Sequence, residues 1–456
     1  MVDSPSPTVV IGLDEPYVRA ILDHLFKGQL EGWTVKSLAP THERDPDTLV
    51  SVTPTAGPLL LWLEYEDLDW DLIFNSTPSR PVLANAYCIR KGLIRKAQMA
   101  FNIHKYVAKN PDSILTRAVP ATFIFELDHP DYLDEALNEN FEIDQALTQN
   151  AQLREAQGTG VETENTGKAG SEIQRFILKP SLTGRGAGIH LFDTREDLEE
   201  ILESYFEDDS DDEEVEDEDT RSVDQGTQIR EWVVQAYVDR PLLLAGGRKF
   251  HIRAYVLALG AVEVFLWRDM LCLFAPHRYT LDDLTDHGVH LTNTCLQTNR
   301  PGFDESRAVY SFWDDLPTLT NAQGEQAPTP EALEAAFDQM KTVLHDLFDA
   351  VTSETTTFQA RQNCFELFGF DFLLDERYGV YLLEANAFPD FKQTGTRLQP
   401  VVEGLFEASA QLVTRQLERY QSEGTEPLPE EAIPPKLHRV FSKALLGRSA
   451  GMPSFP

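Results

Sequence analysis

The chain has 456 residues, with 75 acidic and 39 basic side chains and a formal net charge of −36. Hydrophobic residues make up 42% of the chain, as in ordinary globular proteins, and the length suggests about three domains. So acidic a molecule lacks the positive field that binders of nucleic acids and anionic membranes need, and no apolar run is long enough to span a membrane.

A small α/β domain is expected over residues 1–80. Residues 7–13 and 33–38 are apolar and strand-like, residues 17–26 between them are helix-like, and residues 59–65 form another apolar strand candidate. This β-α-β order is typical of a small parallel α/β unit.

A central domain is expected over residues 81–240, and it opens with a helical pattern at 80–109. Four cations lie there within seven positions, namely Arg90, Lys91, Arg95 and Lys96. In so acidic a protein this group is either an exposed basic helix face or one edge of a phosphate-binding cleft. Residues 148–171 have no apolar period and are interpreted as a linker or long loop.

A glycine-rich hairpin follows the linker. Residues 175–179 form a strand that ends in Lys179, and residues 189–192 form the returning strand. The turn between them contains Gly184, Gly186 and Gly188, which would let the backbone approach phosphate oxygens. The turn is neither a Walker A loop nor a Rossmann fingerprint, and a plain hairpin turn is the alternative.

The negative charge is concentrated at 207–219, where 11 of 13 residues are acidic. Such a run repels itself and has almost no apolar side chains, so we expect a disordered insert. It is either a solvated loop or a docking strip for a basic protein partner.

A C-terminal catalytic domain is expected over residues 241–420. Alternation along 249–259 places Lys249, His251 and Arg253 on one face of a strand, and the next strand, 262–267, ends in Arg268. Two adjacent strands would then offer convergent cations. Residues 330–353 form an amphipathic helix with Pro330 near its first turn.

The segment 364–389 predicts a hairpin that carries a cluster of oxygen ligands. Asp371 lies on its first strand, whereas Glu384 and Asn386 lie two positions apart on the second and share a face. Such a set suits Mg²⁺ together with phosphate oxygens, and the alternative is a solvent-exposed face. The tail, 421–456, looks loosely structured.

The order of these parts resembles the ATP-grasp fold, and the sequence is similar to the tubulin-tyrosine ligase family within it. The likeness is carried by QAYVDRPLLLAGGRKFHIRAYVLAL at 235–259, by HLTNTCLQ at 290–297 and by FELFGFDFLLD with VYLLEANAFP at 365–389. The run EANAFPDFKQTG looks closest to a fungal branch of the family. The resemblance implies an α/β, ATP-grasp architecture with a small N-terminal domain, a central domain and a C-terminal catalytic domain.

The resemblance also implies roles for individual residues. ATP would be bound by Lys96, Lys179, the glycines at 184, 186 and 188, Gln235, Tyr237, Val238, Lys249 and His251, and Mg²⁺ by Asp371, Glu384 and Asn386. Lys249, Arg253 and Arg268 would be catalytic, and Arg253, Arg268, Thr292 and Asn293 would contact the substrate. The family usually has Asp at the position of His251, which affects the expected nucleotide contacts.

The activity that the resemblance implies is ATP- and Mg²⁺-dependent ligation of a carboxylate to an amine through an acyl-phosphate. The expected substrates are a protein acceptor, most of all a tubulin tail, and a free amino acid. The alternative is a nucleotide-binding module of a cytoplasmic complex, such as one associated with processing bodies, with little ligase activity. The four cysteines form no CxxC pair, which favours a reduced protein in the cytoplasm.

Overall fold

The computed structural model describes residues 6–44, 53–54, 56–158, 172–181, 188–207, 231–293, 297, 305–321, 327–391, 395–424 and 426–443. The positions of Gly184 and Gly186 and the acidic run from 208 onward lie outside these residues. No helix in the described ranges is long and apolar enough to cross a membrane.

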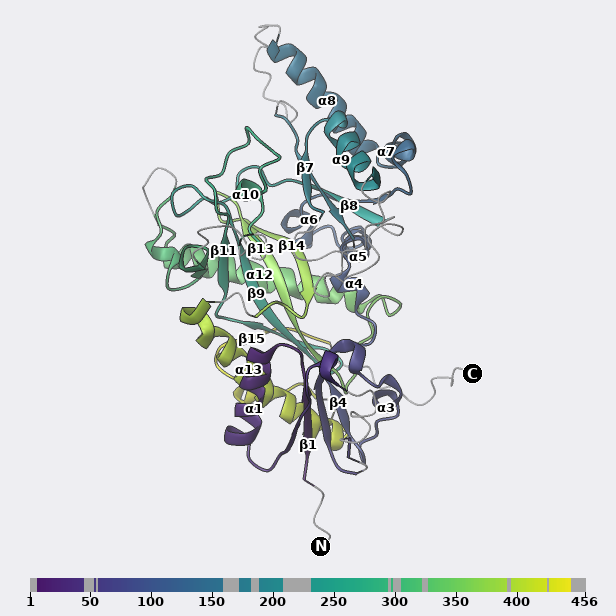
Figure 1. Ribbon diagram of the computed structural model, residues 1–456, viewed down its shortest axis with the longest axis vertical. Helices are drawn as coiled ribbons and strands as arrows, with labels where there is room; N and C mark the ends of the chain where they lie inside the picture. Colours follow the sequence, from purple (N-terminus) through teal and green to yellow (C-terminus); the bar gives the residue numbers. More distant parts are fainter. Residues whose placement is uncertain are drawn as a thin grey trace.

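The N-terminal part is a four-stranded parallel sheet, in the order β2-β1-β3-β4, at the bottom of Figure 1. The β-α-β pattern predicted this arrangement. Its strands are fully buried except for β2, which has no buried residue. The elements are β1 (Thr8–Gly12), α1 (Pro16–His24), β2 (Thr34–Ser37), β3 (Leu59–Leu63), α3 (Trp70–Phe74) and β4 (Val82–Ala84).

A second four-stranded sheet, antiparallel and in the order β5-β8-β6-β7, lies at the other end of the molecule. The predicted hairpin is present, because β6 pairs with β7. The elements are α4 (Lys91–Ile94), α5 (Lys96–Val107), α6 (Leu115–Ala118), β5 (Thr122–Glu126), α7 (Leu133–Glu139), α8 (Phe141–Gly158), β6 (Phe176–Pro180), β7 (His190–Phe192), α9 (Arg195–Glu207) and β8 (Glu231–Ala236).

Helix α8 corrects part of the predicted linker at 148–171, since the helix continues to residue 158. Its apolar anchor, Ile143, Ala146 and Leu147, packs into the core of the second sheet and lies before the stretch that was interpreted as a linker. The following turns carry mostly polar side chains, so their sequence shows no helical period.

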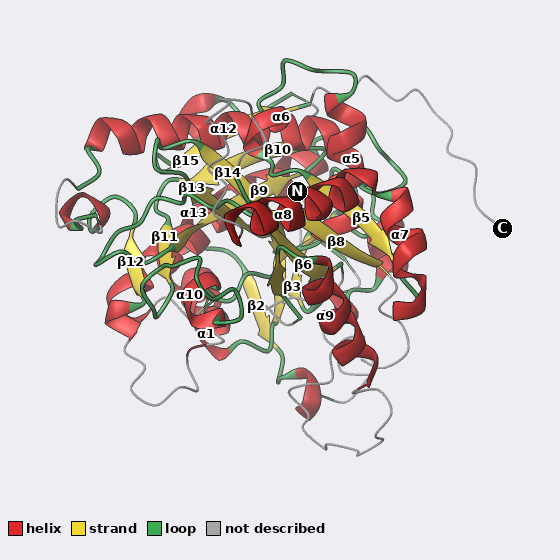
Figure 2. Cartoon of the chain, turned by 90° about the horizontal axis from the view of Figure 1, so that it is seen from above, coloured by secondary structure: helices red, strands yellow, loops and turns green. Residues whose placement is uncertain are grey.

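The large sheet between these two has seven strands and is built around β9. One edge of β9 pairs with β10 and β11 in turn, and the other edge pairs with β13. Helix α12 extends along one side of this sheet (Figure 2). The elements are β9 (Phe250–Leu259), β10 (Glu263–Trp267), β11 (Leu271–Phe274), α10 (His287–His290), β12 (Val309–Ser311), α12 (Pro330–Thr352), β13 (Phe365–Leu374), β14 (Val380–Ala387), α13 (Gly395–Gln421) and β15 (Leu437–Ser442).

Alternation along β9 divides its side chains between two cores. Ile252, Ala254 and Val256 belong to the core that α12 completes, whereas Tyr255 and Leu257 belong to the core that α13 completes with β1 and α1. Helix α13 therefore joins the N-terminal sheet to the large sheet. As predicted, Pro330 lies in the first turn of α12, and Thr329 caps that helix.

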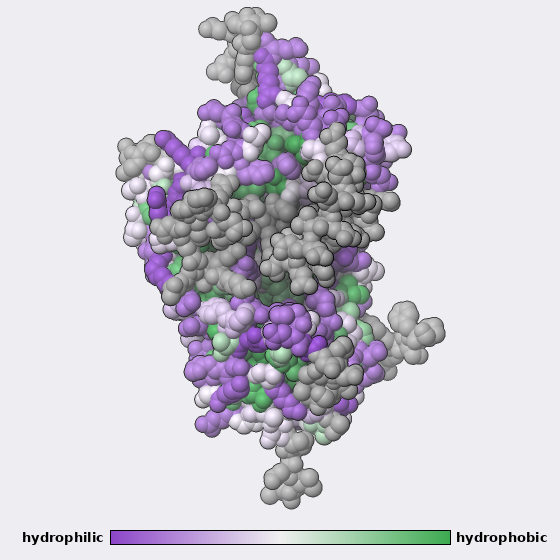
Figure 3. All heavy atoms as spheres, in the orientation of Figure 1, coloured by the Kyte–Doolittle hydropathy of each residue, from purple (hydrophilic) through white to green (hydrophobic). Residues whose placement is uncertain are grey.

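The tail is not loosely structured where it is described, which corrects the expectation for 421–456. Strand β15 pairs with the edge of β10, and Arg439 and Arg419 both contact the buried Glu263. The surface in Figure 3 is mostly hydrophilic, in keeping with the composition.

Candidate active site

The predicted oxygen cluster forms on the hairpin of β13 and β14. Asp371 and Glu384 are direct partners in the antiparallel register, and Asn386 lies opposite Gly369. The Asn386 amide donates a hydrogen bond of 3.2 Å to Glu384 Oε1. A register shift follows Asp371, and such bulges redirect side chains. The three side chains thus converge from two strands, as the alternation predicted.

Cations surround this cluster from three separate segments. Arg253 on β9 holds Asp371 through two contacts, Nε to Oδ1 at 2.5 Å and Nη2 to Oδ2 at 3.1 Å. Lys96, the first residue of α5, places Nζ 3.6 Å from Glu384 Oε2. Lys179 on β6 donates to Gln235 Oε1 at 2.9 Å, which ties it to β8. The basic segment at 90–96 therefore contributes one residue, Lys96, to the cluster.

Arg90, the buried cation of that segment, has a structural partner. Arg90 Nε lies 2.8 Å from Glu366 Oε1, and the guanidinium covers the ring of Tyr65 at 3.7 Å. Lys91 and Arg95 are exposed. The cleft interpretation of the basic group thus applies to Lys96 alone.

The cations determine the charge state of the cluster. Burial by itself would raise the pKa of Glu384, yet Lys96 and Lys179 outweigh it and lower that pKa to about 2. Burial, opposed by Glu384, lowers the pKa of Lys179 to about 8. At neutral pH the site therefore presents an ionised carboxylate, Glu384, near a lysine, Lys179, that burial has made readier to lose its proton.

Strand β8 contains Gln235 and leads into Tyr237 and Val238, which the family resemblance expects to bind ATP. Lys249 Nζ donates to the Tyr237 hydroxyl at 2.9 Å, and that hydroxyl lies 3.0 Å from His290 Nδ1. Burial and the nearby Lys179 lower the pKa of Lys249 to about 7. Tyr237 and Val238 line a cavity of about 450 Å³, while Gln235 points toward Lys179 instead.

His251 lies between Lys249 and Arg253 on the same face of β9, as alternation predicted. Its Nδ1 is 2.5 Å from Thr292 Oγ1, and its Nε2 is 3.7 Å from Asp371 Oδ1. Burial lowers its pKa, so the ring is neutral at physiological pH. Asn293 lines the same cavity as His251 and Glu384. Both of the HLTN residues that were expected to contact the substrate, Thr292 and Asn293, therefore lie at this site.

Gly188 is the described residue of the glycine-rich turn. Its φ is +67°, and a Cβ at this position would meet the Tyr205 hydroxyl at 1.7 Å. A side chain is therefore excluded on both conformational and steric grounds.

Arg268 is not brought to the cluster, and this corrects the expectation of convergent cations from two strands. Leu266 pairs with Val256, so even-numbered residues of β10 face α12 together with the even-numbered residues of β9. Arg268 accordingly pairs with Glu334 of α12 and covers the ring of Trp313 at 4.0 Å. Arg253 projects from the opposite face of the sheet.

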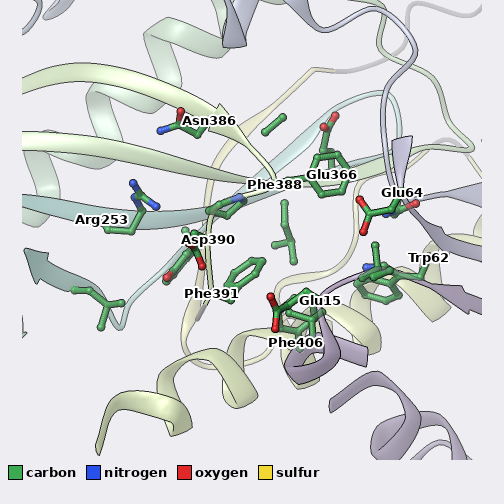
Figure 4. Close-up of a pocket in the computed structure, with 18 of the residues that line it drawn as sticks. Glu15, Trp62, Glu64, Arg253, Glu366, Asn386, Phe388, Asp390, Phe391 and Phe406 are labelled. Carbon is green, nitrogen blue, oxygen red and sulfur yellow. The ribbon is translucent and has the colours of Figure 1, made fainter. Parts of the chain in front are cut away.

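A cavity of about 480 Å³ extends from the cluster and was not predicted from the sequence. It runs from Arg253 and Asn386 to residues of the N-terminal part, among them Trp62 on β3 and Glu64 just after it (Figure 4). Phe388 stands at its wall with a left-handed φ of +51°, which is unusual for a side chain of this size. Phe388 directly follows Asn386 and Ala387 in the chain. Strained backbone conformations of this kind are common at functional sites.

The donor set is compatible with Mg²⁺. Two opposed carboxylates and an amide oxygen are hard ligands, and Mg²⁺ sites typically combine one or two carboxylates with substrate phosphates. Within the described ranges no group of three or more His, Cys, Asp or Glu side chains forms a metal site, so protein carboxylates alone would not enclose an ion. The residues present thus suit a metal that arrives with a nucleotide.

The model of the tubulin-tyrosine ligase family matches residues 84–419. A Schizosaccharomyces pombe protein described as a probable tubulin–tyrosine ligase is 40% identical over 364 residues, which cover 76% of this chain and 80% of that protein. The Saccharomyces cerevisiae protein PBY1, also described as a probable tubulin–tyrosine ligase, is 37% identical over 75% of this chain, although the match spans only 44% of PBY1.

Among solved structures, the C-terminal domain of K. lactis Pby1 matches with a TM-score of 0.62 and 31% identity, covering 96% of this chain and 99% of that domain. That domain is described as an ATP-grasp enzyme that interacts with the mRNA decapping enzyme Dcp2.

Proposed function

The chain belongs to the tubulin-tyrosine ligase family, in its fungal branch, and has an ATP-grasp fold, and we propose that it is an ATP- and Mg²⁺-dependent carboxylate–amine ligase. The observation that carries this proposal is the opposed pair Asp371 and Glu384, with Arg253 and Lys96 beside it and Lys179 close by. Phosphoryl transfer relies on such positioned cations and carboxylates rather than on a nucleophilic side chain.

In the proposed reaction a carboxylate oxygen of the acceptor attacks the γ-phosphorus of ATP, and ADP leaves. The amine nitrogen then attacks the acyl carbon of the resulting acyl-phosphate, phosphate leaves, the amine proton passes to solvent, and an amide bond remains. Both steps build negative charge on phosphoryl oxygens, which Lys96, Lys179 and Arg253 would stabilise.

Asp371, Glu384 and Asn386 would hold Mg²⁺. When bound, the ion would neutralise charge on the phosphate oxygens. Lys249 and the segment from Gln235 to Val238 would bind the remainder of the nucleotide, with Tyr237 fixing the lysine through its hydroxyl. Thr292 and Asn293 would contact the acceptor side.

The acceptor that we propose is a protein tail such as that of tubulin, and the amine is a free amino acid. The test incubates the full chain with ATP, Mg²⁺, detyrosinated tubulin and labelled tyrosine or glutamate. Incorporation that depends on ATP and Mg²⁺ supports the ligase. Absence of both nucleotide binding and incorporation contradicts it.

A second function is favoured by one specific observation. The solved domain of Pby1 that matches nearly the whole chain is described as interacting with a decapping enzyme. A nucleotide-binding module of a cytoplasmic, processing-body complex would bind ATP yet incorporate neither amino acid, and it would retain the decapping enzyme in a binding assay with purified proteins.

A further inference from the structure

The cavity beside the cluster has two ends that are formed by different parts of the chain. One end is formed by Arg253 and Asn386, and the other end by Trp62, Glu64 and Glu15 of the N-terminal part (Figure 4). Its volume of about 480 Å³ is large enough for a small-molecule substrate. The identity of the amine that would occupy this cavity rests on the proposed function.

The charged lining is predominantly acidic. Five carboxylates line the cavity, whereas the one guanidinium among the lining residues, Arg253, already holds Asp371 through two contacts. Arg90 lies beside Glu366 and Lys96 beside Glu384, and Glu15 and Asp390 also have interaction partners. The five are Glu15, Glu64, Glu366, Glu384 and Asp390.

Glu64 lies at the end farthest from Asn386 in Figure 4 and has no cationic partner within the described ranges. One of its oxygens accepts the backbone N–H of Asp14 at 2.7 Å, which fixes the side chain. Burial is the main cause that raises the pKa of Glu64, and the charges of Asp14, Glu66 and Asp67 raise it further, whereas the hydrogen bond from the Asp14 N–H lowers it. A ligand cation here would meet a positioned carboxylate in acidic surroundings.

A separate feature also indicates a ligand. Tyr255 is 1% exposed and lines the cavity, and its hydroxyl has no hydrogen-bond partner among the residues that the structure describes. Leaving such a group unpaired is costly, so a polar ligand atom at this point would be stabilising. The stretch between the two polar ends is aromatic, with Phe365, Phe391 and Phe406 on the wall.

We propose that this cavity binds an amine substrate with an aliphatic stem and a second, distal ammonium group, and that its reacting amino group loses a proton to solvent before it attacks. The reacting amino group lies at the end formed by Arg253, Tyr255 and Asn386. The stem packs along the aromatic wall, and the distal ammonium lies beside Glu64 at the end of the cavity that Trp62 also lines, where the carboxylate favours a cation. Glutamate would bring its side-chain carboxylate to the acidic wall. Glycine has no side chain and would leave the aromatic part of the cavity unfilled.

The test is isothermal titration of the full chain, loaded with Mg²⁺ and a non-hydrolysable ATP analogue, with four ligands. Lysine carries both ammonium groups, norleucine lacks the distal one, cadaverine lacks the carboxylate and glutamate reverses the distal charge. We expect lysine to bind at least about tenfold more tightly than norleucine or glutamate. Cadaverine binding shows that a free diamine suffices, and its absence shows that the substrate is a basic amino acid.

The variant Glu64→Gln keeps the acceptor for Asp14 but loses the charge. We expect it to weaken lysine binding about tenfold and to leave norleucine binding unchanged, while Glu31→Gln, at an exposed position outside the cavity, changes neither. Equal binding of lysine and norleucine, or equal effects of the two variants, overturns the inference. Nucleotide binding is measured first in the same cell, so failure of the analogue to bind counts against the proposed function instead.

Discussion

Asp371 and Glu384 face each other across β13 and β14, and each carboxylate is held by a different cation, Arg253 for Asp371 and Lys96 for Glu384. The two cations come from segments more than 150 residues apart in the chain. Register, and not proximity in sequence, thus assembles the proposed phosphoryl-transfer site. The following experiments test its parts separately.

Replacing Arg253 with lysine keeps the charge but removes the two-point contact with Asp371. Because a lysine cannot reproduce that planar geometry, we expect phosphate release during ligation to fall at least about tenfold. The matched control is Arg415→Lys on the exposed face of α13. Equal rates for the two variants would show that the bidentate geometry has no role.

Lys249 makes nucleotide binding depend on protons. Its pKa of about 7 means that the side chain is largely neutral at about pH 8, and a nearby triphosphate would raise that pKa. We therefore expect ATP binding to take up protons at about pH 8, measured by titration calorimetry in buffers of different ionisation enthalpy. Lys249→Met should reduce that uptake, and an unchanged uptake would contradict the assignment.

The same pKa determines how Lys249 affects the stability of the ligand-free protein. Its folded-state value lies below the value of about 10.4 in unfolded chains, so the unfolded state binds more protons between the two. The contribution of Lys249 to the free energy of unfolding therefore rises with pH through this window. Chemical denaturation of wild type and Lys249→Met across the window should show a steeper rise for wild type.

Arg268 tests whether a residue's role follows from its position in the structure or from the family resemblance. Its contacts with Glu334 and Trp313 lie on the α12 face, away from the cluster. We expect Arg268→Gln to lower the free energy of unfolding by about 1 kcal/mol and to change phosphate release less than about twofold. A loss of activity with unchanged stability would restore the catalytic role that the family resemblance implies.

Phe441 of β15 tests whether the tail is part of the folded core. The side chain is 7% exposed and packs against the core beneath α12. We expect Phe441→Ala to lower the free energy of unfolding by about 3 kcal/mol, whereas Ser442→Ala, at the exposed end of the strand, changes it by less than about 0.5 kcal/mol. Equal unfolding midpoints for the two variants would show that the tail is dispensable.

Much of the fold and of the cluster was predictable, because both depend on local patterns. Alternation placed Lys249, His251 and Arg253 on one face and Glu384 with Asn386 on another, and these assignments require no knowledge of pairing. Arg268 differed because the face of a residue beyond the end of β10 depends on the register with β9, which the sequence does not specify.

The cavity and the tail were not predictable for a related reason. Trp62, Phe365 and Phe406 lie on three elements that are distant in sequence and meet only when α13 packs between two sheets. Strand β15 is short and polar at three of its six positions, so its pairing with the edge of β10 is a tertiary effect.

The most direct test of the account is Mg²⁺-dependent ATP turnover by Glu384→Gln. Mutation of groups that only support a metal ligand lowers metal affinity or activity by about 10- to 100-fold. Loss of this carboxylate, a proposed ligand itself, should therefore reduce turnover by more than about 100-fold. The fold should persist, as judged by circular dichroism, and the exposed Glu407→Gln should match wild type. Wild-type turnover by Glu384→Gln would contradict the assignment of Asp371, Glu384 and Asn386 as the magnesium and phosphate site.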